Sequence, residues 1–139
     1  MRYFIFPIEN IYIAVSADKV KRFISHNSEE SSDNGKIKIT VNSIFGKLHN
    51  TDNKIFSHDI VLKQKTNDNK TLILVTPPVE RDIDVAENQI QNLPGSFSGV
   101  YSSFNGLYFD KQNIIFFLNL EKTISLWFKK PEHEREGFL

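Results

Sequence analysis

The sequence predicts a mainly β domain of about nine short strands, with a few helical turns and one C-terminal helix. Short runs of alternating apolar and polar residues predict the strands, and clusters of Asn, Asp, Gly and Pro between them predict turns. Helical spacing of apolar residues appears near the C-terminus. Strands of this number and length are typical of small β-barrels or a β-sandwich. At 139 residues, one domain with one core is expected.

The first elements are a predicted hairpin and a helical turn. Two apolar runs within residues 3–15 are separated by Glu9 and Asn10, which indicates two paired strands joined by a turn. Ser16 is expected to be the N-cap of one helical turn. Residues 20–24 are then expected to return to strand.

A polar segment interrupts this pattern. Residues 26–35, HNSEESSDNG, contain no apolar side chain. In residues 36–41, Ile and Val alternate with Lys and Thr, which predicts a half-buried strand. A second polar connection is expected at residues 47–58.

The middle of the chain predicts strand, turn and strand over residues 59–75. Asn67, Asp68 and Asn69 are expected in the turn because these side chains tolerate left-handed backbone conformations. Residues 71–75, TLILV, are apolar on both alternating faces and are therefore expected in the middle of the core. The two prolines that follow are expected to bend the chain.

A short strand and a turn are predicted within residues 79–94. Asp84 and Glu87 have the spacing of a capping box for this turn. Ile90 and Leu93 are expected to hold the turn against the core.

The C-terminal part predicts two or three further strands, with a tight turn at residues 110–113, and then a helix over 119–130. Glu121 in the first helical turn and Lys129 in the last suit the helix dipole. Residues 131–139 are too polar to pack and are expected to form a mobile tail. The apolar residues with helical spacing are Leu120, Ile124, Trp127 and Phe128.

The composition excludes several classes of function. Lys and Arg number 17, as do Asp and Glu, so no net charge favours nucleic acid or an anionic membrane. The absence of Cys excludes disulfides, Cys-ligated zinc and thiol catalysis. No signal peptide is recognisable, and the apolar runs are too short to span a bilayer. We therefore expect a soluble, cytoplasmic protein.

No residue pattern predicts catalysis, a metal site or a cofactor. The chain has no glycine-rich phosphate loop and no GxSxG motif. The strongest charge cluster lies at residues 80–84, where Glu80, Asp82 and Asp84 are expected to line one exposed strand face. An acid–base pair is the alternative interpretation. The histidines are expected in polar loops or at a strand entrance, at His26, His49, His58 and His133.

Four segments, IYIAVSADKVKRFI, ITVNSIFGK, KTLILVTPPVERDIDVAENQIQNLP and FNGLYFDKQNIIFFLNLEKTI, occur in an order that resembles the CheW-like domain family of bacterial chemotaxis. The resemblance spans roughly residues 2–126. It implies one domain over 1–130, made of two fused small β-barrels at roughly 10–56 and 57–120 that share the N-terminal strand. The positions that match the family pattern are Val20, Val41, Asn42, Ile44, Pro94 and Leu118 to Lys122.

The chain departs from the family pattern at residues 26–35, where relatives carry about twenty further residues that end in an N-L-R-G motif. Its arginine is implicated in coupling receptors to a kinase. Pro77 and Pro78 interrupt a strand, and Asn119 replaces an aspartate. Loss of a strand predicts a reduced first barrel, with an open edge beside residues 37–41 or 20–24.

The resemblance implies a non-catalytic adaptor that binds a CheA-type histidine kinase, a chemoreceptor or another CheW-like domain. Two alternatives stay open: a module outside chemotaxis that self-associates through the open edge, and a small-ligand binder with a cleft near Asp82 and Tyr108. By resemblance, the expected partner-binding residues are Ile39, Val41, Ile44, Phe45, Ile60 and Leu62. The alternative is that these six are core positions.

Overall fold

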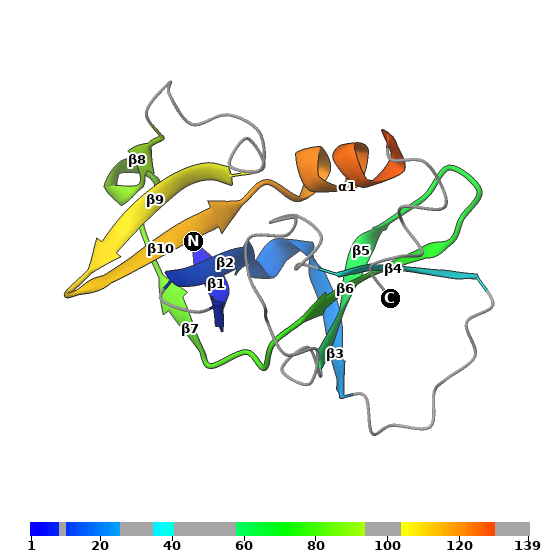
Figure 1. Cartoon of the computed structure of the whole chain (residues 1–139), viewed down its shortest axis with the longest axis horizontal. Helices are drawn as coiled ribbons and strands as arrows, with labels where there is room; N and C mark the ends of the chain where they lie inside the picture. The colour runs from blue at the N-terminus through cyan, green and yellow to red at the C-terminus, as the bar shows by residue number, and fades with distance from the viewer. Residues whose placement is uncertain (9–10, 26–34, 41–57, 94–103, 130–139) are drawn as a thin grey trace.

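A computed structural model describes residues 1–8, 11–25, 35–40, 58–93 and 104–129 (Figure 1). It confirms a mainly β fold with a short C-terminal helix. The elements are β1 (Arg2–Ile8), β2 (Ile11–Ser16), the 3-10 turn η1 (Ala17–Lys19), β3 (Val20–Ser25), β4 (Lys36–Thr40), β5 (His58–Lys65), β6 (Thr71–Thr76), β7 (Arg81–Asp84), the 3-10 turn η5 (Glu87–Gln89), β8 (Gln91–Asn92), β9 (Phe104–Asp110), β10 (Asn113–Leu118) and α1 (Leu120–Lys129).

The strands form two sheets. A six-stranded sheet has the order β7-β1-β2-β10-β9-β8, and a four-stranded sheet has the order β3-β5-β6-β4. Figure 1 shows the chain passing from β2 through η1 directly into β3, so this segment joins the two sheets. The predicted hairpin is confirmed, because β1 and β2 pair antiparallel from Tyr3↔Ser16 to Ile8↔Ile11.

The six-stranded sheet curls, because its two edge strands are close in sequence. β7 ends at Asp84 and β8 begins at Gln91, with η5 between them. A connection of this length spans at most about 20 Å, whereas the edges of a flat six-stranded sheet lie about 24 Å apart. The concave side encloses its own small core of Ile5, Ala14, Val85, Ile115 and Phe117.

A larger core lies between the two sheets. Along β1, β2 and β10, the residues next to those of the small core point to the opposite face of the sheet; among them are Phe6, Ile13 and Phe116. There they pack with the four-stranded sheet and with α1, which leads from β10 toward that sheet (Figure 1). Consequently β1, β2 and β10 are buried on both faces.

Each sheet contains strands that come before and strands that come after residues 56 and 57 in the sequence. The expected boundary between the two sub-barrels lies at these residues. β5 and β6 follow this point but pair with β3 and β4, which precede it. The apolar sequence of β6 explains its position, since residues 72–75 are all buried between β5 and β4. The boundary itself lies outside the described residues.

β3 and β4 are the end strands of the four-stranded sheet, among the strands that the structure describes. This agrees with the expected edge beside residues 20–24 or 37–41. In β4 the alternation is also as predicted, with Ile39 buried and Lys38 partly exposed. Val41 lies outside the described residues.

Two predicted turns are confirmed by their backbone angles. Asn69, in the turn between β5 and β6, has φ of 64°, and its N–H donates to the Thr66 carbonyl over 2.9 Å. In the turn between β9 and β10, Lys111 has φ of 58°. Ser16 precedes η1 as expected, but its side chain makes no capping hydrogen bond.

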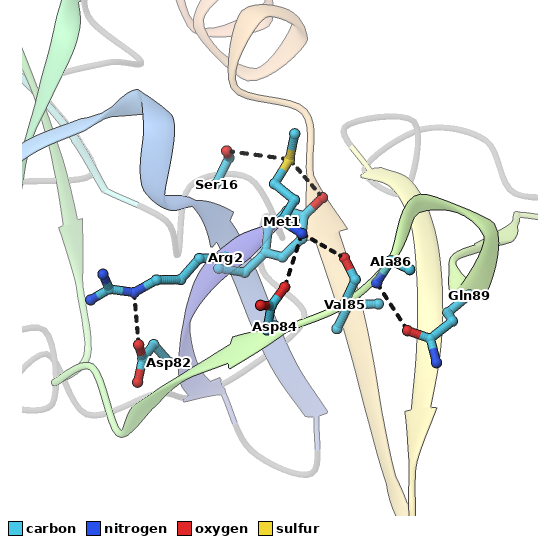
Figure 2. Close-up of polar contacts among 9 residues, drawn as sticks. Met1, Arg2, Ser16, Asp82, Asp84, Val85, Ala86 and Gln89 are labelled. Carbon is cyan, nitrogen blue, oxygen red and sulfur yellow. Dashed lines mark hydrogen bonds and ion pairs between the residues drawn. The ribbon is translucent and has the colours of Figure 1, made fainter.

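The predicted capping box of Asp84 and Glu87 is wrong. β7 continues through Asp84, and η5 starts only after Ala86, whose N–H donates to Oε1 of Gln89 over 2.9 Å (Figure 2). Asp84 therefore lies too early in the chain to cap the turn. Ile90 packs against the small core as predicted.

Helix α1 begins after Asn119, whose Oδ1 accepts a hydrogen bond from the Lys122 N–H over 3.0 Å. Asparagine thus provides the cap at the position where the family pattern has aspartate. Phe128, which shares the helical spacing of the apolar residues, is 39% exposed and lies at the edge of the buried face. The buried helix residues are Leu120, Thr123, Ile124 and Trp127.

Candidate functional site: a cleft at the barrel mouth

A cleft of about 670 Å³ opens at one end of the curled six-stranded sheet. Among the described residues, its lining comes from the start of β1, the end of β2 with η1, the segment from η5 to β8, the start of β9, and the junction of β10 with α1. Apolar groups are contributed by Ile90, Phe117, Leu118 and Leu120. Polar and charged groups are contributed by Tyr3, Ser16, Asp18, Lys19, Glu87, Asn92, Asn105, Asn119 and Glu121.

The inner wall of the cleft is part of the small core. The rings of Tyr3 and Phe117 meet edge to face, with centroids 4.7 Å apart and planes at 75°. Phe117 is buried, and both residues belong to central strands of the sheet. Because these strands are packed on both faces, the inner wall is held rigidly.

Met1 lines one side of the cleft, and Figure 2 shows its polar contacts. Its amino group donates to Oδ1 of Asp84 over 2.9 Å and to the Val85 carbonyl over 3.2 Å. Its sulfur lies 3.3 Å from the hydroxyl of Tyr3 and 4.0 Å from that of Ser16. The side chain nevertheless stays 56% exposed, so it borders the cleft without filling it.

The charge cluster at residues 80–84 is occupied by ion pairs. Arg2 Nε lies 2.7 Å from Asp82 Oδ2, and Arg81 lies 2.8 Å from Asp110. Together with the amino group on Asp84, these pairs fasten β7 to the start of β1 and to the end of β9. This agrees with an exposed, solvated strand face, where each pair contributes at most about 1 kcal/mol.

The mouth of the cleft carries negative charge. Among the described residues that line it, Asp18, Glu87 and Glu121 bring three carboxylates, whereas Lys19 brings one ammonium group and Met1 brings its amino group, which is paired with Asp84. Burial is the main cause that raises the pKa of Tyr3 above 10.0, and the carboxylates of Glu87 and Asp18 raise it further. Their negative potential therefore reaches the inner wall of the cleft.

Comparison with solved structures identifies the architecture. The chain is similar to the scaffolding protein CheW from Thermoanaerobacter tengcongensis, seen in a crystal structure, with a TM-score of 0.66 and 16% sequence identity. The match covers 86% of this chain and 84% of that chain. This chain has the CheW-like fold. No protein-family model matches it, and no curated protein matches it either.

The CheW-like fold was predicted correctly, but the expected partner-binding residues that the structure describes do not line the cleft. Ile39, Ile60 and Leu62 are 1%, 0% and 2% exposed, respectively, in the larger core. Their burial supports the alternative interpretation of these three as core positions. The other three, Val41, Ile44 and Phe45, lie outside the described residues.

The cleft also lies away from the site suggested near Asp82 and Tyr108. Asp82 is exposed beside Arg2, and Tyr108 packs against the small core of the CheW-like fold. His58 begins β5 as expected. Within the described ranges, no three His, Asp or Glu side chains come close enough to hold a metal ion. The described helices are all too short or too polar to cross a membrane.

Sequence reasoning missed the cleft because its acidic residues come from distant elements. Asp18, Glu87 and Glu121 each lie in the first turn of a helical element. Acidic residues are common there, since they interact favourably with the helix dipole. The signal that relates them is topological: the CheW-like fold gathers the starts of η1, η5 and α1 around one opening.

Proposed function

We propose that this protein is a non-catalytic adaptor of bacterial chemotaxis signalling, which acts in the cytoplasm by binding other proteins. The observation that carries the proposal is the fold likeness to a scaffolding protein, which extends over 86% of this chain and 84% of the other. Its proposed partners are a CheA-type histidine kinase, a chemoreceptor or another CheW-like domain.

The geometry of the described residues favours binding over chemistry. The acidic side chains of β7 that have cationic neighbours, Asp82 and Asp84, hold strands together. The cleft, by contrast, combines a rigid apolar wall with a polar border, as sites that receive an anchoring side chain do. We propose the cleft as a docking site of the adaptor.

The segment at residues 26–35 suggests how this adaptor differs from others with the same fold. It reads HNSEESSDNG, where the family pattern has the N-L-R-G arginine. We therefore propose that the protein occupies an adaptor position without supplying that coupling arginine. Val41, Ile44 and Phe45, which follow β4 in the sequence, stay predicted contributors to a partner surface.

The test is direct binding to purified fragments: the regulatory domain of the CheA-type kinase and the tip of a chemoreceptor from the same organism. The adaptor function predicts a dissociation constant of about 1–100 μM for at least one fragment, measured by biolayer interferometry. The catalytic activity of the kinase serves as the readout of coupling. Failure to bind either fragment would overturn the proposal.

Within the binding test, Asn92→Trp probes the docking site. Asn92 is exposed on β8 and borders the cleft, so an indole there would obstruct the opening. Gln91→Trp is the matched control, because Gln91 is the neighbouring exposed residue and does not line the cleft. Docking in the cleft predicts weaker binding for Asn92→Trp alone.

A second candidate function is self-association through strand edges. It is favoured by the end positions of β3 and β4 in the four-stranded sheet, since end strands present backbone donors and acceptors to other chains. Sedimentation velocity over a hundredfold concentration range tests it. This candidate predicts a rising sedimentation coefficient and no binding to kinase or receptor fragments, whereas a constant monomer value would exclude it.

A further inference from the structure

We propose that the cleft at the barrel mouth selects partners that insert a basic side chain, Arg or Lys, flanked by apolar residues. This inference rests on the proposed docking function and adds the chemistry that the docking segment must have. It is carried by three features of the cleft: its charge, its apolar wall and the separation of its carboxylates.

The charge is local and comes from three directions. Asp18 lies on η1, Glu87 on η5 and Glu121 at the start of α1, so carboxylates border the opening on separate elements. Lys19 and the amino group of Met1 are the cationic groups among the described lining residues, and the amino group is paired with Asp84. Carboxylates therefore stay in excess at the cleft, whereas the whole chain has a formal net charge of zero. An inserted cation is therefore attracted, and an anionic segment is repelled.

The apolar wall suits the stem of a basic side chain. Phe117, Leu118 and Ile90 offer apolar surface inside the border of carboxylates. Lys and Arg bury their methylene groups along such surface while their charged ends stay near water and acids. Tyr3 also lines the cleft, and the face of its ring would attract a guanidinium group.

The separation of the carboxylates disfavours a metal ion as the occupant. In the described part of the chain, no three acidic or His groups are close enough to share one ion. A metal ion needs its ligands within about 2.0–2.6 Å. A guanidinium or ammonium group on a long stem can instead interact with carboxylates several ångströms apart.

The test compares two peptides that differ only in charge. Acetyl-Leu-Arg-Leu-amide and acetyl-Leu-citrulline-Leu-amide have nearly the same shape, but citrulline is neutral. Each is titrated into the ¹⁵N-labelled protein up to about 10 mM, and amide shifts are followed by NMR. We expect the arginine peptide to bind at least about fivefold tighter, with shifts centred on Tyr3, Glu87 and Glu121.

Variants assign the preference to the cleft. The double substitution Asp18→Asn with Glu87→Gln should abolish the difference between the two peptides. Glu80→Gln, which neutralises an exposed acid outside the cleft, should leave it unchanged. Circular dichroism checks that all variants fold.

Three outcomes would overturn the inference: equal affinity for both peptides, shifts that map away from the cleft, or no binding of the arginine peptide. Each is distinguishable from failure of the adaptor function. If a kinase or receptor fragment binds the protein but the two peptides bind with equal affinity, only the charge preference is refuted. If the arginine peptide binds tighter than the citrulline peptide but neither fragment binds, only the proposal of chemotaxis partners is refuted.

Discussion

Lys38 Nζ lies 3.8 Å from Oδ2 of Asp59, and this ion pair joins β4 to β5 across β6, the strand that lies between them. The Asp59 side chain is 8% exposed, whereas that of Lys38 is 36% exposed. The carboxylate is thus buried, and the ammonium group reaches it from the surface. Buried carboxylates require cations or hydrogen-bond donors, so this pair helps to position the end strand β4.

Substitution of Lys38 by Met should destabilise the fold. The change keeps the stem but removes one cation that faces buried Asp59, and we expect a loss of about 1–2 kcal/mol in free energy of unfolding. The value is below that of a fully buried pair, because Lys38 is partly solvated. Urea denaturation measures it. Lys36→Met, two residues earlier in β4, is the control, and equal stability of both variants would contradict the account.

Substitution of Gly106 by Ala should disturb the cleft border. A Cβ atom at Gly106 would lie 2.6 Å from the Gln91 carbonyl oxygen and 2.7 Å from Cγ2 of Ile90. Because the first of these atoms belongs to the backbone of β8, the strands must move apart. We expect a loss of about 1–3 kcal/mol in free energy of unfolding, as overpacking produces.

The control for this change is Gln112→Ala, in the exposed turn between β9 and β10. Thermal denaturation should show a lower Tm for Gly106→Ala and an unchanged Tm for Gln112→Ala. A Gly106→Ala protein that is as stable as the parent would show that β8 and β9 do not approach each other as described.

The raised pKa of Tyr3 makes stability depend on alkaline pH. Burial, with Glu87 and Asp18, disfavours the phenolate in the folded state, so the unfolded chain releases this proton first. The contribution is therefore complete below pH 10.0 and is lost as pH rises from 10.0 through the folded pKa. We expect the parent to lose stability in that range faster than Tyr3→Phe does.

Phenolate absorbance at 295 nm measures the titration of Tyr3 as the difference between the parent and Tyr3→Phe. Glu87→Gln should bring the pKa of Tyr3 closer to its ordinary value without restoring it, because burial is the largest cause. A Tyr3 that titrates at or below 10.0 would contradict its burial, and an unchanged pKa of Tyr3 in Glu87→Gln would contradict the negative potential assigned to the cleft.

The sequence predicted the elements whose side chains repeat regularly. The alternation in β4, the apolar run of β6 and the turn at Asn69 depend on neighbours in sequence, and all three are found in the structure. The resemblance of four segments in order predicted the CheW-like fold.

Features that depend on distant segments were not predictable in this way. β5 and β6 pair with strands that precede residue 57, because strand pairing depends on the whole fold. The Asp84–Glu87 spacing suggested a cap, but β7 uses Asp84 to hold the amino group of Met1. The cleft border comes from η1, η5 and α1, which no local pattern relates.

The most direct test of the central claim is isothermal titration of the kinase regulatory domain and of the receptor tip with the parent protein and with Asn92→Trp. The account predicts that at least one fragment binds the parent, that Asn92→Trp weakens this binding about tenfold or more, and that Gln91→Trp does not. Binding of neither fragment to the folded parent protein would contradict the claim that its surfaces serve chemotaxis signalling.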